Sequence, residues 1–265
     1  MNKKQARRGW IAIFGILLGL FAYGILECRQ RHTPQRRIPV ASSSTNSVGR
    51  YTNHPSDAVQ AKLEALRKNP YRERHPEMKG LAQVPPLGTD RLVLRGINSG
   101  DYDDFFATWN DRDAVYMLIY IPWPTSKEQA IHYLHSLSYQ ASRQEGLYWA
   151  ITEPDAGRLM GVIGLTLESS FDRAELHYWL AKPYWGKGYA TEAAKRVIDY
   201  VFRDLNIHRL EVNCFSDNAR SKRVIEKCGF QHEYLRKECL KKEGQYKDID
   251  YYYLLQQDYL GIQQE

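Results

Sequence analysis

The sequence predicts an α/β fold in which a mixed, mostly antiparallel sheet is flanked by helices. Two observations support this prediction. Three strand patterns follow one another directly between residues 147 and 180, which is typical of an antiparallel meander. Helix and strand patterns then alternate, which is typical of strands connected through helices. A sheet that contains both kinds of connection is expected to be mixed.

Residue type and spacing predict each element in turn. Ser126, two residues after Pro124, is a good cap for the second helix, and Glu128 adds negative charge to its first turn. Gly229 ends the last helix, and Gly244 marks the turn between the final two strands. The predicted elements are a strand at 91–95, helices at 101–109 and 126–142, strands at 147–151, 158–165 and 174–180, a helix at 190–205, a strand at 209–215, a helix at 219–228, and strands at 231–238 and 247–256.

The composition is that of an ordinary globular protein. The chain has 265 residues, of which 43% are hydrophobic and 26% charged, and its formal net charge is +6 at pH 7. Basic residues gather around one apolar stretch near the N-terminus, so we expect them to flank a membrane segment, and we expect no nucleic-acid partner. These residues are Lys3, Lys4, Arg7, Arg8, Arg29, Arg31, Arg36 and Arg37.

The apolar stretch at residues 10–26 contains no charged side chain. As a helix it would span roughly 25 Å, close to the ~30 Å of a bilayer core. A membrane anchor, a cleaved signal peptide and a buried helix are the three interpretations. The run ends at Glu27-Cys28-Arg29 without a small-x-small cleavage pattern, and its glycines and basic flanks disfavour a buried helix. The anchor is the favoured interpretation.

We therefore expect three parts: a single-pass membrane anchor at 1–28, a linker at 29–88, and a globular domain at 89–262. The linker is rich in serine and threonine at 41–47, where too little apolar surface is available to offset the entropy of ordering. A short helix is expected within it, because Val59, Leu63 and Leu66 stand at helical spacing. Both flanks of the anchor are basic, so charge does not decide its orientation.

The four cysteines are scattered along the chain. No two of them form a Cys-x-x-Cys pair, and no histidine stands at zinc-ligand spacing from them. We therefore expect reduced structural thiols and no metal site. The four are Cys28, Cys214, Cys228 and Cys239.

The segment 183–192 has the strongest chemical signature in the chain. Gly186 and Gly188 allow the backbone to bend closely around a ligand, and a helix begins directly after them. The free N–H groups and the positive dipole end of that helix form an anion site, to which Lys187 adds charge. Alone, this pattern is also compatible with a tight strand-to-helix turn. It lacks the third glycine of a dinucleotide fingerprint and the Gly-Lys-Ser/Thr of a P-loop.

Three further elements accompany this loop. They are the opening Thr-Asp-Arg-Leu-Val-Leu-Arg at 89–95, the segment from Asn218-Ala219-Arg220-Ser221 to Gly229-Phe230, and Gly-Gln-Tyr-Lys-Asp at 244–248. With the loop, they resemble the GNAT acetyltransferase superfamily, and within it the ribosomal-protein N-terminal acetyltransferases (RimJ/RimL-like). The family's pyrophosphate loop reads Gln/Arg-x-x-Gly-x-Gly/Ala, and here Trp185 stands in the first position, as that branch often has.

The resemblance implies an acetyl-CoA-dependent N-acetyltransferase. The strands at 174–180 and 209–215 would part to admit the pantetheine arm, and a backbone N–H there would polarise the thioester carbonyl. Asn218 would bond the pantetheine or acetyl region, with a helix N-cap as its structural alternative. The implied cofactor-binding residues are Trp179, Leu180 and Ala181 at the pantetheine, Trp185, Gly186, Lys187, Gly188, Tyr189, Ala190 and Thr191 at the pyrophosphate, and Asn218.

The implied reaction is the direct attack of an amine on the thioester. Glu175, on the strand beside the thioester, is the candidate base, either directly or through a water, and an ordinary paired carboxylate is the alternative. Ser221 matches a family position proposed to protonate the leaving thiolate, or it orients the sulfur. His177 shares a strand face with Glu175 and is interpreted as structural, with a second base as the alternative.

The expected acceptor is a protein N-terminal α-amine. The alternatives are a small amine, such as a polyamine, amino sugar or antibiotic, and a non-catalytic, membrane-tethered CoA-binding adaptor. The acceptor site is expected between the first two helices and the last hairpin, with Trp109, Tyr120, Trp123 and Tyr246. A polycationic amine remains an alternative acceptor because of three acidic residues, Asp101, Asp103 and Asp104.

Acetyl-CoA is available in cytosol-like compartments. We therefore expect the globular domain on the cytosolic side of the membrane, with the anchor bringing it to that surface.

Overall fold

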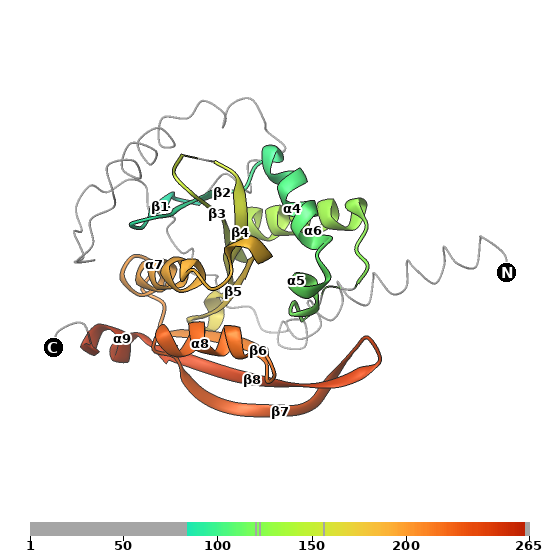
Figure 1. Cartoon of the computed structure of the whole chain (residues 1–265). Coiled ribbons are helices and arrows are strands. Elements are labelled where there is room, and N and C mark those ends of the chain that lie inside the picture. Colours follow the sequence, from blue (N-terminus) through green and yellow to red (C-terminus); the bar gives the residue numbers. More distant parts are fainter. Residues whose placement is uncertain (1–83, 120, 122, 156, 263–265) are drawn as a thin grey trace. The chain divides into compact units, whose positions relative to one another are not determined.

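One eight-stranded sheet organises the domain. The computed structural model describes residues 84–119, 121, 123–155 and 157–262. Within them the strands have the order β1-β2-β3-β4-β5-β6-β8-β7 (Figure 1). The pair β5–β6 is parallel, and the other neighbouring pairs are antiparallel. The prediction of a mixed, mostly antiparallel sheet with flanking helices is confirmed.

Each predicted element of the domain has a counterpart in the structure. The strands are β1 Leu87–Gly88, β2 Val93–Gly96, β3 Gly146–Thr152, β4 Leu159–Glu168, β5 Arg173–Leu180, β6 Arg209–Phe215, β7 Gln231–Lys242 and β8 Gln245–Leu255. The α-helices are α4 Tyr102–Trp109, α5 Arg112–Tyr116, α6 Lys127–Ser142, α7 Tyr189–Arg203, α8 Ala219–Lys227 and α9 Gln256–Ile262, and the 3₁₀ helices are η3 Ser99–Asp101, η4 Ser169–Phe171 and η5 Lys182–Tyr184.

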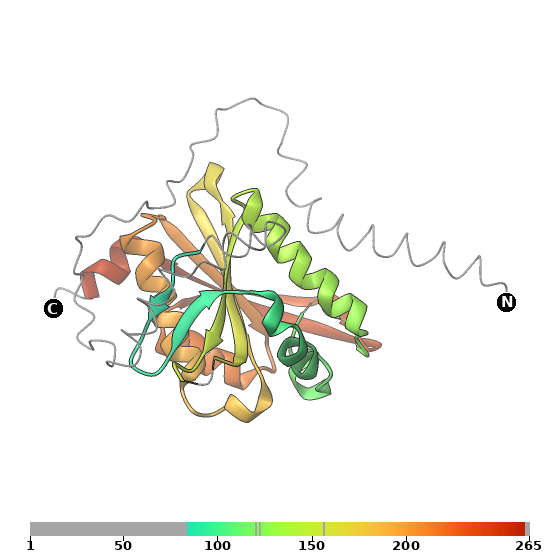
Figure 2. The ribbon, with the colours of Figure 1, turned by 90° about the horizontal axis from the view of Figure 1, so that it is seen from above.

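Helices cover the two faces of the sheet separately. In Figures 1 and 2, α7 lies on one side of the strands β3 to β5, and α6 lies on the other. One apolar cluster joins Trp149 and Leu176 to Val197 on α7. A second joins Tyr148 and Val162 to the helices α4 and α6. Because side chains alternate along a strand, adjacent residues of β3 enter different clusters.

Helix α6 begins where the sequence predicts. The Ser126 side chain accepts from Gln129 N–H at 3.2 Å, and the Gln129 side chain accepts in return from Ser126 N–H. This is a capping box, which satisfies two donors of the first turn. Glu128 contributes negative charge to that turn, as the sequence predicts.

Strand β1, two α-helices, the three 3₁₀ helices and part of one strand were not predicted. Strand β1 lies at the end of the segment expected to be linker. Helix α5 has five residues, too few to show a helical period, although its cap, Asp111, accepts from the N–H groups of Asp113 and Ala114. Helix α9 follows β8 without a break, where a strand was expected to continue to residue 256. Strand β7 runs on to Lys242 across a register shift between Arg236 and Leu240.

Among the described residues, no helix is long and apolar enough to cross a membrane. The predicted anchor at 10–26 and the short helix expected in the linker lie outside the described residues.

Three cysteines of the described region carry free thiols, and Cys28 lies outside that region. Burial raises the pKa of Cys214 to about 11 and that of Cys228 to about 12. Cys239 is partly exposed. The two buried cysteines therefore act as small apolar side chains at neutral pH.

An ion pair closes the start of the domain. Arg95, on β2, donates to both carboxylate oxygens of Asp101 at 2.8 and 2.6 Å, and it also donates to the carbonyl of Gly157 at 2.9 Å. The side chains are only 10% and 3% exposed. Asp101 also accepts from Asn98 N–H at 2.8 Å, so the pair holds η3 against the β3–β4 turn.

We predict that Asp101→Ala lowers the free energy of unfolding by about 3–5 kcal/mol, because it leaves the Arg95 guanidinium buried without its counterion. Asp103→Ala is the matched control. It removes an exposed partner of Lys127 and is expected to change stability by less than about 1 kcal/mol. Urea unfolding followed by circular dichroism measures both, and equal losses would contradict this assignment.

Candidate active site

The strands β5 and β6 part in the middle of the sheet. They pair from Arg173 with Arg209 to Glu175 with Glu211, and no further pairing follows. Strand β5 nevertheless runs on to Leu180 and β6 to Phe215. Both strands continue without each other, as the family resemblance implies.

The alternating direction of backbone hydrogen bonds along β5 identifies the groups that face this gap. Ala181 N–H donates to the carbonyl of Met160 beside β4 at 2.8 Å. Because hydrogen-bonding direction alternates along an antiparallel strand, Trp179 also directs its backbone groups to β4, whereas Tyr178 and Leu180 direct theirs to the gap. The carbonyl of Leu180 accepts from the Trp185 indole at 2.8 Å. The predicted pantetheine pairing with Trp179, Leu180 and Ala181 stays a prediction, and alternation favours Tyr178 and Leu180 as partners.

The loop between β5 and α7 has the backbone of an anion site. Gly186 has φ +76° and Gly188 has φ +82°, the left-handed region that glycine tolerates. Gly188 is the N-cap of α7 and has no side chain to cap the helix. The first N–H groups of α7, those of Tyr189, Ala190 and Thr191, are therefore available to a ligand anion.

A brace from the start of the domain holds this loop. Arg91 donates from Nε to Glu192 at 2.7 Å and from its guanidinium to the carbonyl of Lys187 at 3.1 Å. Its guanidinium also lies 4.6 Å from the ring centre of Tyr189. Thr89 donates to the same carboxylate at 2.5 Å. Glu192, in the first turn of α7, is thus neutralised and does not repel an anion at the helix end.

Further positive charge borders the loop. The Arg220 guanidinium lies 4.2 Å from the ring centre of Trp185, and the Lys187 ammonium lies 5.9 Å from that of Tyr184. Beside Arg91, which pairs with Glu192, two further cations therefore lie at the loop, an arrangement that favours a pyrophosphate.

Glu175 lies where the two strands begin to part. Its carboxylate accepts from the amide of Asn213 on β6. His177 Nδ1 lies 4.0 Å from the same carboxylate, and His177 Nε2 lies 3.0 Å from Thr166 Oγ1. The side chain of Glu175 is 36% exposed, so solvent or a substrate reaches it.

A second polar pair lies on the opposite face of β5. The hydroxyls of Tyr178 and Ser221 are 2.7 Å apart. Burial raises the pKa of Tyr178, so its hydroxyl stays protonated. Because successive side chains of a strand point to opposite faces of the sheet, this pair and Glu175 lie on opposite faces of β5. Sequence reasoning did not single out Tyr178. It stands three positions from Glu175 in the same strand, and this spacing predicts that the two side chains point to opposite faces of the sheet.

Asn218 caps α8. Its side-chain oxygen accepts from Ser221 N–H at 3.1 Å, which is the structural alternative expected from the sequence. The cap fixes Ser221 in the first turn, where it meets Tyr178. Contact of Asn218 with a ligand stays a prediction.

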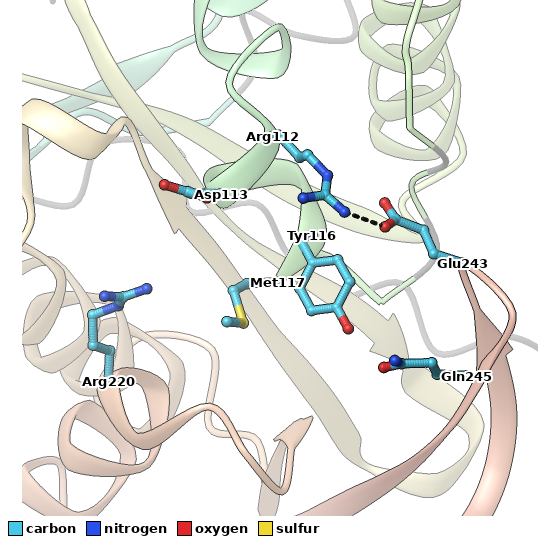
Figure 3. Close-up of a pocket in the computed structure, with 7 residues that line it drawn as sticks. All are labelled: Arg112, Asp113, Tyr116, Met117, Arg220, Glu243 and Gln245. Atoms are coloured by element: carbon cyan, nitrogen blue, oxygen red, sulfur yellow. Dashed lines mark hydrogen bonds and ion pairs between the residues drawn. The ribbon is translucent and has the colours of Figure 1, made fainter.

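A cavity of about 350 Å³ lies at the open end of the gap (Figure 3). Helix α5, the N-terminal turn of α8 and the β7–β8 turn form its walls. Both of its carboxylates have a cation of the protein as partner, because Glu243 pairs with Arg112 at 2.8 Å and Asp113 pairs with Lys182. The Lys182 ammonium lowers the pKa of Asp113. The lining residues are Arg112, Asp113, Tyr116, Met117, Arg220, Glu243 and Gln245.

The predicted acceptor residues are only partly gathered around this cavity. Trp109 is 2% exposed and belongs to the cluster beneath α6, and Trp123 packs against that cluster. Tyr246 is 63% exposed beside the β7–β8 turn. Tyr120 lies outside the described residues. In the described part of the chain, no group of three or more metal-ligating side chains occurs.

Lys242 fastens the β7–β8 hairpin to α5. Its ammonium donates to the carbonyls of Val115 and Ile121 at 3.1 Å each and to that of Leu118. The residue is 6% exposed, and burial lowers its pKa to about 8. The three carbonyls stabilise the ammonium. They belong to the last turn of α5 and the residues after it, where the helix dipole also favours a cation. This clasp fixes two walls of the cavity.

The comparisons with known proteins agree on one family. A family model described as the acetyltransferase (GNAT) domain matches residues 91–231. The uncharacterized N-acetyltransferase YoaA of Bacillus subtilis is 32% identical over 169 residues, which cover 63% of this chain and 95% of YoaA. The [ribosomal protein uS5]-alanine N-acetyltransferase of Escherichia coli is 27% identical over 179 residues, which cover 61% of this chain and 86% of that protein.

The fold recurs in solved structures. The spermidine N-acetyltransferase from Vibrio cholerae, in complex with CoA and spermine, has a TM-score of 0.58 and 24% identity, and the match covers 65% of this chain and 99% of that one. The relatives therefore include enzymes named for a protein acceptor and for a polyamine acceptor. The adaptor alternative finds no support among them.

We predict that Lys242→Met lowers the free energy of unfolding by about 2–4 kcal/mol, because three carbonyls lose their donor. The matched control is Lys241→Met at the exposed neighbouring position, where a change of about 0.5 kcal/mol or less is expected. Thermal and urea unfolding measure both variants. If Lys242→Met were as stable as the control, the clasp would not contribute to stability.

Proposed function

Because the chain belongs to the GNAT acetyltransferase family and is an acetyl-CoA-dependent N-acetyltransferase, we propose that its acceptor is a protein N-terminal α-amine. The observation that favours this acceptor is the pairing of three acidic side chains at the start of α4. Asp101 is bound to Arg95, Asp103 to Lys127 and Asp104 to Arg158. These three carboxylates were the reason to keep a polycationic amine as an alternative acceptor. Each of them already has a cation of the protein as its partner.

The paired carboxylates of the cavity support the same choice. Glu243 and Asp113 both face it, and each pairs with a cation. A polyamine would have to displace Arg112 or Lys182 to find a counterion. A single α-amine, delivered by an extended peptide, needs no such array of carboxylates. The E. coli relative that acts on a ribosomal-protein alanine adds weight to this proposal.

On the donor side, we propose that the loop from Trp185 to Thr191 holds the pyrophosphate of acetyl-CoA. The residues fit that group: the end of α7 lacks a side-chain cap, two glycines have positive φ, and cations surround it. The pantetheine would lie in the gap between β5 and β6, where Tyr178 and Leu180 offer backbone groups. Asn218 would border it from α8.

On the acceptor side, we propose that Glu175 takes the proton of the attacking amine. As the nitrogen–carbon bond forms and the carbon–sulfur bond breaks, the leaving sulfur takes the electron pair. Ser221 stands on the opposite face, where its hydroxyl can protonate that sulfur and regain a proton from solvent. Tyr178 keeps its own proton and holds the Ser221 hydroxyl through their hydrogen bond. The weaker role of Ser221, orienting the sulfur, needs only the same contact.

The acceptor class is tested by acetyl-CoA turnover with two panels. One contains peptides that differ in their first residues, and the other contains spermidine, spermine and amino sugars. We expect peptides with a free N-terminus to react with kcat/KM at least tenfold above any small amine, and N-terminally blocked peptides to be inert. A preference for polyamines would overturn the proposed acceptor and leave the acetyl-CoA site untouched.

We predict that Gly188→Ala raises the Kd of acetyl-CoA about tenfold, because a side chain at φ +82° costs about 1–2 kcal/mol and disturbs the N-cap of α7. Gly229→Ala is the matched control. Gly229 has φ +85° at the far end of α8, so it suffers similar strain away from the loop. Isothermal titration should show the control unchanged within twofold, and equal weakening in both would count against the loop as the pyrophosphate site.

We predict that Glu175→Gln lowers kcat by about 10²–10⁴-fold, the usual contribution of a positioned base, with little change in the KM of acetyl-CoA. Glu168→Gln on the adjacent strand β4 is the control, and its kcat should stay within twofold. A loss of less than threefold in Glu175→Gln would exclude Glu175 as the base.

We also propose that residues 10–26 anchor the enzyme in a membrane, with the catalytic domain on the cytosolic side. The support is the uncharged apolar run itself and the location of acetyl-CoA. The full chain is expected in the membrane fraction after an alkaline carbonate wash, with its domain degraded by protease added from the cytosolic side. Recovery in the soluble fraction would contradict the anchor, and protection from that protease would contradict the orientation.

A further inference from the structure

Asn213 connects the two strands at the point where they part. It stands on β6 two residues beyond Glu211, the last residue of β6 that pairs with β5. Its side-chain amide donates to Oε1 of Glu175 on β5. The main-chain hydrogen bonds between β5 and β6 end at Glu175 and Glu211. The side-chain hydrogen bond from Asn213 to Glu175 therefore connects the two strands just beyond that point.

The carboxylate of Glu175 is contacted from one side. Asn213 Nδ2 and His177 Nδ1 both approach Oε1, the latter at 4.0 Å. In the described part of the chain, Oε2 has no hydrogen bond of its own. The other charged or titratable groups that face Glu175 are Arg173 on its own strand, Glu211 as its register partner on β6, and Tyr148 on β3.

Asn213 is held from its other side by the sheet. Its register partner is Tyr251 on β8, and β8 pairs with β6 along the whole of that strand. Residues of β6 on either side of Asn213 are buried beneath α7 and α8, namely Val212 and Cys214. The amide therefore belongs to a rigid strand, and it imposes its position on Glu175.

We propose that Asn213 is a positioning residue for the acetyl transfer, which holds Oε1 of Glu175 so that Oε2 faces the attacking amine. This inference rests on the proposed role of Glu175 as the base. The amine nitrogen forms its bond to the acetyl carbon, the carbon–sulfur electron pair leaves with sulfur, and the amine proton passes to Oε2. An amide suits this position because it donates an N–H without adding charge beside the base.

The test compares Asn213→Asp with wild type over a pH series of kcat. Aspartate keeps the shape and replaces the donor by a negative charge, which disfavours the ionised form of a neighbouring carboxylate. We expect the acidic limb of the profile to move about one pH unit higher and kcat at pH 7 to fall about tenfold. The KM of acetyl-CoA should change by less than twofold.

Gln231→Glu is the matched control. It makes the same change of charge on β7, three strands along the sheet from β5, and its acidic limb should stay within about 0.3 pH units of wild type. In the Glu175→Gln background, Asn213→Asp should cause no further shift. If the limb of Asn213→Asp stayed in place while Glu175→Gln lost activity, the positioning role would be overturned.

The proposed function fails in a different way. If Glu175→Gln kept kcat within threefold, the base itself would be wrong, whatever the Asn213 variants show. If Asn213→Asp failed to fold, as judged by circular dichroism, Asn213→Leu replaces it. We expect Asn213→Leu to lose about tenfold in kcat at unchanged acetyl-CoA KM, because the donor is gone, and a loss below twofold would overturn the inference.

Discussion

The parting of β5 from β6 is the constraint on which the rest of the site depends. A sheet normally satisfies its backbone groups strand by strand, and an interior pair that separates leaves donors and acceptors that need another partner. Here the strands pair only as far as Glu175 and Glu211, inside an eight-stranded sheet whose other pairs hold it rigid. The backbone groups of Tyr178 and the N–H of Leu180, which face the gap, give a ligand with amide groups, such as a pantetheine arm, a strand-like place to bind. Side chains on the two faces of the gap, Glu175 on one and Ser221 on the other, then flank whatever lies between them.

The charges around the gap are neutralised by partners within the chain, and this keeps both walls in place. Glu192 is held by Arg91 and Thr89, so the end of α7 keeps its attraction for an anion. Lys242 uses three carbonyls in place of a carboxylate, and it ties the hairpin to α5. A site with its own charges balanced selects by shape and by directed hydrogen bonds more than by net attraction. That property is compatible with a peptide acceptor, whose amine is a single charge on a neutral backbone.

Local patterns were enough to predict most of the fold. The capped start of α6 at Ser126 and the bounds of β6 follow from signals within a few residues. Helix α5 was missed because five residues show no period, and the length of β7 was missed because a register shift interrupts its alternation. The loop at Gly186 and Gly188 was found because positive φ leaves a mark on residue type.

The contacts across the gap could not be predicted in the same way. Asn213 and Glu175 are 38 positions apart in the sequence, and Tyr178 and Ser221 are 43 apart. A local sequence pattern does not extend over such distances. Each pair depends on the register between strands and on the packing of α8, which a local pattern does not contain. The family resemblance supplied Glu175 and Ser221 but neither of their partners. Asn218 is the opposite case. Local sequence predicts that it caps the next helix, and its side chain forms that cap.

The most direct test of this account is a crystal structure of the full chain with CoA. The account predicts the pyrophosphate on the N–H groups of Tyr189, Ala190 and Thr191, the pantetheine bonded to the backbone of Tyr178 or Leu180, and the sulfur between Glu175 and Ser221. A structure in which CoA binds outside the gap, or with its sulfur remote from both side chains, would contradict the central claim.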